Sequence, residues 1–158
     1  MSTNFAYISP ASIPSSSANS VHVVLQCAAL VGEDVKLKIY ANRTIKDSTK
    51  LKASLIVNYG VNLENAKLVT FFTNSKWFIN LRIALMAFFD QLFDPNPCIV
   101  LSRNLYFSFL YAVFLGRPLL FETHQVEYGF RKMLQRWTMI RPWVKTIIIS
   151  KKLGEILT

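Results

Sequence analysis

Short apolar runs alternate along this chain with longer segments of helical periodicity, and this alternation restricts the possible folds more than any other feature. The apolar runs predict strands at residues 5–9, 35–40, 68–72, 98–101, 119–122 and 145–150. Helices are predicted after a cap at Asn19 or Ser20, just before residues 58–61, and over residues 77–93, 105–115, 130–141 and from 151 onwards. Strands that alternate with helices form βαβ units, so we predict an α/β fold with a doubly wound parallel sheet.

Two of the predicted strands differ in polarity. Residues 35–40 alternate apolar side chains with lysines, which is typical of a strand with one wet face and indicates the edge of a sheet. Residues 98–101 are entirely apolar, which fits a central strand covered by helices on both sides. The proline- and serine-rich residues 10–17 predict a loop between the first strand and the first helix.

Composition narrows the class of protein. The 158 residues are enough for about one domain with a substantial core, and a hydrophobic share of 52% excludes intrinsic disorder. Cys27 and Cys98 lie in apolar surroundings without metal-ligand spacing, so we expect buried thiols in a reducing compartment, with a disulfide as the alternative. The N-terminus lacks a signal-peptide pattern and residues 105–116 are too few to span a bilayer, so we expect a cytoplasmic protein.

The charge is strongly positive, with 18 basic and 9 acidic residues and a net charge of +9, which favours anionic partners. The excess is concentrated in residues 128–154, where no acidic residue occurs. One helical face of this segment carries the apolar residues Phe130, Met133, Leu134, Trp137 and Ile140. The segment therefore fits either a core-facing helix with a solvated basic back or a helix on an anionic membrane surface. No nucleic-acid-binding module accompanies the charge, so nucleic acid is not expected as a partner.

In a doubly wound sheet the binding site lies outside the carboxyl ends of the strands. Glu122 and His124 leave one such end, and residues two apart on an extended segment point the same way, so they are predicted to share a cleft. A histidine can exchange a proton with a substrate hydroxyl near neutral pH, although a solvated loop pair is the alternative. Arg103 follows the apolar strand 98–101, where it can hold a carboxylate or phosphate or form a salt bridge to Glu122.

Further candidates lie at the start of the first helix and at the last strand end. Residues 9–19 form a hydroxyl-rich loop before a helix N-terminus, which suits a phosphate, but the loop lacks the glycines of a dinucleotide-binding fingerprint and is equally an ordinary polar loop. His22 is a ligand candidate or a packing or capping residue, and Ser150 ends the last predicted strand. No Asp-x-Asp motif occurs, so no metal is expected.

The order of these motifs resembles the N-terminal domain of the family-four (group 1) glycosyltransferases, which have the GT-B fold. The resemblance begins with YISPASIP at residues 7–14 and SANSVHV at residues 17–23. It continues with the tyrosine–glycine element in NYGV at residues 58–61 and with the strand-end arginine in LSR at residues 101–103. Its last elements are the Glu-x-His of Glu122-Thr123-His124 and a segment with Ile149, Ser150 and Leu153.

The resemblance implies that residues 1–158 form a Rossmann-like, acceptor-side half of a GT-B enzyme, without the donor-binding C-terminal domain. It implies transfer of a hexosyl unit, with retention, from a nucleotide diphosphate sugar to a polysaccharide or lipid-linked acceptor, at the cytoplasmic membrane face and without a cofactor. The implied catalytic residues are His124 and Glu122. The implied substrate-binding residues are Arg103, Ser17, Asn19, His22 and Ser150. Because both domains must hold the reacting groups, this chain alone is expected to be inactive.

A second hypothesis comes from a different class of protein. The basic segment of residues 131–152 also fits a non-catalytic Rossmann-like module that binds a membrane surface or a partner protein.

Overall fold

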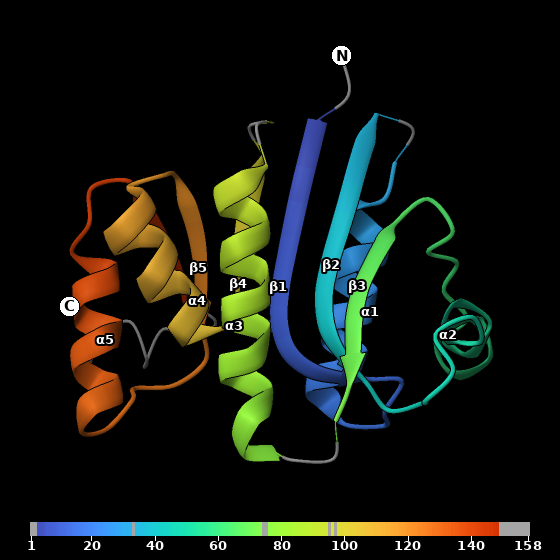
Figure 1. Cartoon of the computed structure of the whole chain (residues 1–158). Coiled ribbons are helices and arrows are strands. Elements are labelled where there is room, and N and C mark those ends of the chain that lie inside the picture. Colours follow the sequence, from blue (N-terminus) through green and yellow to red (C-terminus); the bar gives the residue numbers. More distant parts are fainter. Residues whose placement is uncertain (1–2, 33, 74–75, 95, 97, 149–158) are drawn as a thin grey trace.

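The computed structural model describes residues 3–32, 34–73, 76–94, 96 and 98–148, and there it confirms the predicted alternation of strands and helices. Within these residues six parallel strands form one sheet in the order β3-β2-β1-β4-β5-β6 (Figure 1). The strands are β1 (Thr3–Ile13), β2 (Val35–Arg43), β3 (Lys67–Phe72), β4 (Ile99–Ser102), β5 (Leu119–Thr123) and β6 (Val144–Ile148). The strand order reverses between β1 and β4, which is the doubly wound, Rossmann-like topology.

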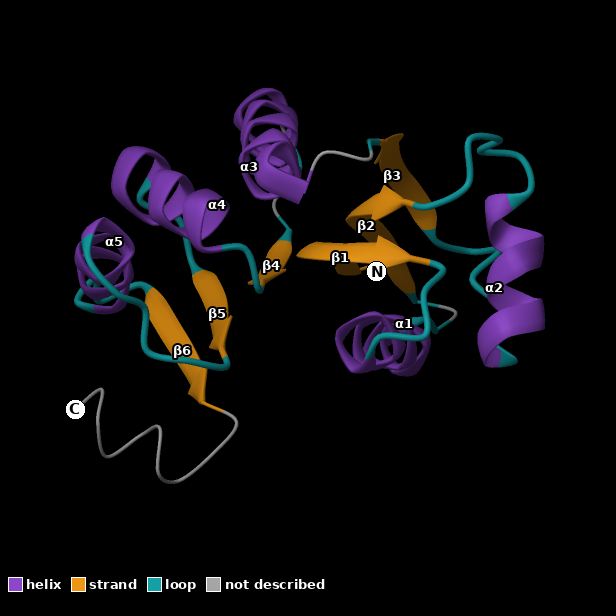
Figure 2. Ribbon diagram, turned by 90° about the horizontal axis from the view of Figure 1, so that it is seen from below, coloured by secondary structure: helices purple, strands orange, loops and turns teal. Residues whose placement is uncertain are grey.

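Helices cover both faces of this sheet (Figure 2). Helices α1 (Ala18–Leu30) and α2 (Leu51–Tyr59) pack on one face, and α3 (Lys76–Phe93), α4 (Leu105–Leu110) and α5 (Phe130–Met139) pack on the other. A π-helical turn, η1 (Tyr111–Leu115), continues α4. The core accordingly has two layers, and the neighbours Tyr7 and Ile8 of β1 point into different layers, as the alternation of a strand requires.

The first strand is longer than predicted, and the loop expected from residue 10 was wrong. Strand β1 continues to Ile13, and its register with β2 shifts between Ile8 and Ser12. Pro10 lies within this irregularity, where a missing backbone N–H costs no regular ladder hydrogen bond. The predicted cap was also displaced, because Ser17 caps α1 and its Oγ accepts a hydrogen bond from the backbone N–H of Ser20 at 3.3 Å.

The prediction that residues 35–40 form an edge strand was wrong. Strand β2 lies between β1 and β3, and the strands at the two edges of the described sheet are β3 and β6. One of the two lysines that suggested a wet face has carboxylate partners: Lys38 Nζ lies 3.0 Å from Asp90 Oδ2 and 3.3 Å from Asp94 Oδ2. Carboxylates at the end of α3 therefore replace the water that the alternation suggested.

The prediction that residues 98–101 form a central strand is confirmed, because β4 lies between β1 and β5. Gly60 and Gly116 end α2 and η1 with left-handed φ values of 67° and 61°. Both cysteines are free thiols, as predicted, but only Cys27 is buried and Cys98 is half-buried. Burial raises the pKa of Cys27 to about 12, which makes it a packing residue and a poor nucleophile at neutral pH.

None of the described helices is long and apolar enough to cross a membrane. The helix predicted from residue 151 lies outside the described residues.

Candidate functional site

The carboxyl ends of β4 and β5 bring together residues that are far apart in the sequence. Arg103 directly follows β4, Glu122 lies in β5, and His124 follows that strand. His22 reaches the same place from the second turn of α1. This group of four residues is called the carboxyl-edge site below, and its centre is the carboxylate of Glu122.

Glu122 is almost completely buried, with 2% of its side chain exposed. Its Oε1 lies 3.1 Å from His124 Nε2, 3.4 Å from His22 Nε2 and 3.5 Å from Arg103 Nε. Glu122 and His124 thus lie together, as predicted. Arg103 forms the salt bridge to Glu122 that the sequence left open as the alternative to a ligand contact. A buried carboxylate requires such partners, because an unpaired charge in a core costs several kcal/mol.

Sequence reasoning missed two residues that support this carboxylate. Gln26 donates from Nε2 to the second oxygen, Glu122 Oε2, at 3.2 Å. The hydroxyl of Tyr7, on β1, donates in turn to Gln26 Oε1. Burial raises the pKa of Tyr7, so that phenol stays protonated and remains a donor. The available signal was the spacing of His22 and Gln26, which are four residues apart and so share one face of α1.

Arg103 is only partly satisfied by its neighbours. Its side chain is 6% exposed, and its Nη2 contacts the His124 ring. Its Nη1 is buried and has no hydrogen-bond partner among the described residues. Buried donors are almost always paired in folded proteins, so the unpaired Nη1 is a group that a water molecule or a ligand oxygen would satisfy.

His124 is much more exposed than Glu122, with 38% of its side chain exposed. Partial burial lowers its pKa below the ordinary value of 6.5, and the nearby Arg103 guanidinium lowers it further, while Glu122 opposes both effects. The imidazole is therefore neutral at pH 7 and can accept a hydrogen bond. The ring of His22 stands edge-on to it, with 6.2 Å between the centroids.

A small cavity opens beside these residues. Its volume is about 160 Å³, and its lining includes Pro10, Asn104, Arg103, His124 and Arg131. Arg131 is held there by Glu127, whose Oε1 accepts from Nη2 at 2.7 Å and raises the pKa of the guanidinium. The cavity thus offers cationic and amide groups to a small polar portion of a ligand.

The remaining predicted site residues do not join this cluster. The hydroxyl of Ser17 caps α1, and Asn19 is exposed in the first turn. Within the described part of the chain no hydrogen bond links either residue to Arg103, Glu122 or His124. Ser150 lies outside the described residues. Substrate binding by these three residues stays a prediction.

The described residues of the site are not arranged as a metal centre. Among the described residues no group of at least three His, Cys, Asp or Glu side chains is arranged to hold a metal ion. His22, Glu122 and His124 lie together, but the Arg103 guanidinium contacts both Glu122 and His124. A fixed cation at that place disfavours a second one.

Comparisons of this chain with protein-family models, with curated proteins and with solved structures find no match.

Proposed function

We propose that this chain is the acceptor-side domain of a retaining glycosyltransferase, which transfers a hexosyl unit from a nucleotide diphosphate sugar to an acceptor hydroxyl. The observation that carries the proposal is the convergence of Arg103, His124 and His22 on the buried carboxylate of Glu122, at the edge of the sheet where doubly wound folds bind ligands. The Glu-x-His element and the strand-end arginine are the residues that the sequence resemblance assigns to the reaction.

In this proposal His124 orients a hydroxyl group of the reacting sugars. The neutral imidazole accepts a hydrogen bond from the hydroxyl, and Glu122, 3.1 Å from Nε2, fixes the position of the ring. Glu122 does not exchange protons with substrate in this scheme, because it is buried beneath the histidines. Its role is to hold His124 and Arg103 in place.

Arg103 supplies the charged contact. Its unpaired Nη1 donates to an oxygen of the donor phosphate or of the acceptor, while Nε stays with Glu122 at 3.5 Å. The cavity of about 160 Å³ accommodates a single small group, such as one phosphate or a sugar hydroxymethyl, and not a whole nucleotide. The nucleotide is therefore assigned to a second, donor-binding domain.

The test is a transfer assay on the full-length natural protein. Labelled uridine, guanosine and adenosine diphosphate sugars are supplied with polysaccharide and lipid acceptors, and label in the acceptor is measured. We expect His124→Ala to lower kcat by about 100-fold, because the reacting hydroxyl is no longer held in position. Lys46→Ala, on the exposed turn before α2, is the control and keeps wild-type kcat. Residues 1–158 alone are expected to give no transfer.

Two results would contradict the proposal. One is wild-type kcat in a folded His124→Ala protein. The other is the absence of transfer from every donor by the full-length protein.

Glu122→Gln serves as a second probe of the site. It keeps the shape of the side chain but not its charge, and it should lower kcat less than His124→Ala does.

A further inference from the structure

The outer side of α3 is apolar, although it faces away from the core. Its residues Ile83, Ala84 and Ala87 are buried against the sheet. Six large apolar side chains on the opposite side are between 39% and 76% exposed: Phe78, Leu81, Leu85, Phe89, Leu92 and Phe93. Arg82 is the basic residue exposed among them. A surface helix of a globular domain normally carries polar residues there. A shallow groove of about 520 Å³ runs along this side and is lined by Phe78, Leu85 and Phe89 among others.

Helix α5 also exposes most of its apolar side chains. The sequence left open whether its apolar face meets the core or the surface, and only Leu134 of that face is buried. The other members are between 39% and 66% exposed: Phe130, Met133, Trp137 and Ile140. The buried positions of this helix include the polar residues Gln135 and Thr138.

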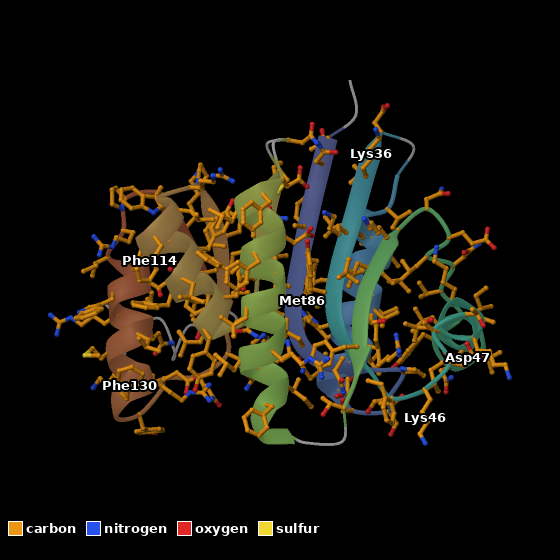
Figure 3. All side chains as sticks on the ribbon, in the orientation of Figure 1. Lys36, Lys46, Asp47, Met86, Phe114 and Phe130 are labelled. Carbon is orange, nitrogen blue, oxygen red and sulfur yellow. The ribbon has the colours of Figure 1, made fainter. Side chains whose placement is uncertain are left out.

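These residues belong to one continuous layer of helices. Helix α4 packs against both α3 and α5, and the three helices lie on the same face of the sheet (Figures 1 and 2). Phe109 of α4 stacks on Trp137 at a centroid distance of 6.0 Å and meets Phe114 of η1 at 6.2 Å. Phe114 is 67% exposed and points outward beside α5, as does Phe130 (Figure 3). We call the exposed apolar side of α3, η1 and α5 the outer helical face.

The charges of this layer are positive wherever they are not paired. Its acidic side chains are engaged: Asp90 and Asp94 pair with Lys38, and Glu127 pairs with Arg131. The basic side chains of the layer that form no salt bridge within the described residues are Arg82, Arg117, Lys132, Arg136 and Arg141. A second copy of the chain would bring two such faces of like charge together, which disfavours a homodimer through this surface.

From this combination we propose that the outer helical face binds the surface of an anionic lipid bilayer, with α3 and α5 lying in the headgroup region. The exposed phenylalanines and Trp137 enter the boundary between headgroups and acyl chains, and the basic residues meet the lipid phosphates. Large exposed apolar patches mark interaction sites, and an anionic bilayer satisfies both the apolar and the cationic character of this one. The inference does not depend on the proposed transferase activity.

Co-sedimentation with vesicles tests the proposal on the full chain. Vesicles of phosphatidylcholine with about one third phosphatidylglycerol are expected to retain the protein at low salt and to release it progressively as salt is added. The double variant Leu85→Glu with Phe89→Glu should weaken binding by more than about tenfold, because charged groups replace buried apolar area. The matched control is Ile56→Glu with Val57→Glu on α2, which are 44% and 85% exposed and lie outside the outer helical face, and it should weaken binding much less.

A charge-matched pair separates local contact from net charge. Lys132→Glu with Arg136→Glu should weaken binding by about fivefold or more for each cation lost. Lys46→Glu with Lys50→Glu changes the net charge equally, but on the exposed turn before α2 at the other end of the molecule (Figure 3), and should have a much smaller effect. Equal loss in both pairs would overturn the assignment to this face.

Other outcomes also overturn it. These are no retention on anionic vesicles at low salt, and equal retention on pure phosphatidylcholine at every salt concentration. A third is a stable dimer in analytical ultracentrifugation that Leu85→Glu with Phe89→Glu dissociates, because the outer helical face would then be a protein interface. Circular dichroism confirms folding of each variant. Since no transfer is measured, failure here leaves the proposed function intact, and failure of the transfer assay leaves this inference intact.

Discussion

The carboxyl-edge site and the outer helical face distribute polarity in opposite ways. In the site the charged side chains of Glu122 and Arg103 are 2% and 6% exposed. On the face Phe93 and Phe130 are 76% and 66% exposed. Burying charge and exposing apolar area both oppose folding, so neither arrangement is what stability alone would favour.

The difference shows which parts of the molecule are shaped by something other than the fold. Both regions meet in the same short stretch of chain, because α4 begins close to Arg103 and η1 contains Phe114. Between them Phe107 and Tyr111 are buried and stacked at 5.2 Å, as an ordinary core requires. An ordinary packed core around Phe107 and Tyr111 thus separates the carboxyl-edge site from the outer helical face. Both of these regions lower the stability of the fold, which is expected of surfaces that bind something.

Removal of the buried carboxylate should have the largest effect on stability. In Glu122→Ala the guanidinium of Arg103 stays buried without its partner, and we expect a loss of about 3–5 kcal/mol in the free energy of unfolding. Urea denaturation measures it. Glu64→Ala, at an exposed position, is the control and should change stability by less than about 0.5 kcal/mol. A loss below about 1 kcal/mol for Glu122→Ala would mean that water reaches and solvates Arg103.

Phenylalanines in the helical layer give the sharpest contrast between core and outer helical face. Phe107 is completely buried, so Phe107→Ala should cost about 3–4 kcal/mol. Phe89→Ala removes the same side chain at 51% exposure and should change stability by less than about 0.5 kcal/mol. Thermal and urea unfolding of both variants measure the difference. Comparable losses would show that Phe89 packs on protein and would break the comparison.

The alternation of strands and helices was predictable from local sequence patterns, whereas the order of the strands in the sheet was only partly predictable. The period of apolar residues reports which side of an element is buried, and it correctly indicated each strand and the central place of β4. The position of β2 was mispredicted because Lys38 is satisfied by Asp90 and Asp94, which lie some fifty residues later in the chain. Periodicity contains no information on such distant partners.

The site shows the same limit. The spacing of Glu122 and His124 and the place of Arg103 after a strand were sufficient to predict that they meet. The support from Gln26 and Tyr7 was missed, because it depends on the rotation of α1 above β1. The side of α5 that faces the sheet could not be predicted either, since Gln135 is buried through hydrogen bonds to Thr123 and to the backbone of Glu127.

The cap of α4 offers an intermediate effect at the boundary of the site. Asn104 accepts a hydrogen bond from the Phe107 N–H at 3.1 Å and donates to the Asn80 carbonyl at 2.8 Å. Asn104→Ala removes both, and we expect a loss of about 1–2 kcal/mol in unfolding free energy. Asn58→Ala, an exposed residue that donates to Ser54 at 2.7 Å within α2, should cost less. A greater loss for Asn58→Ala would contradict the importance of the cap.

The smallest effect concerns the pH dependence of stability through His124. Burial and Arg103 lower its pKa below 6.5 in the folded protein, so the unfolded chain binds a proton more readily. The contribution of His124 to the free energy of unfolding is therefore complete above the pKa of the unfolded chain. It is lost as the pH falls from about 6.5 towards the lower pKa of the folded protein. His124→Gln should therefore flatten the curve of unfolding free energy against pH in that window. Asp90 and Asp94 have pKa values lowered below 3.8 and keep their contribution there, so they do not obscure the change. Parallel curves for wild type and variant would mean that Glu122 stabilises the protonated imidazole enough to cancel the effects of burial and Arg103. The pKa of His124 would then not be lowered, which would contradict the neutral imidazole that its proposed role requires.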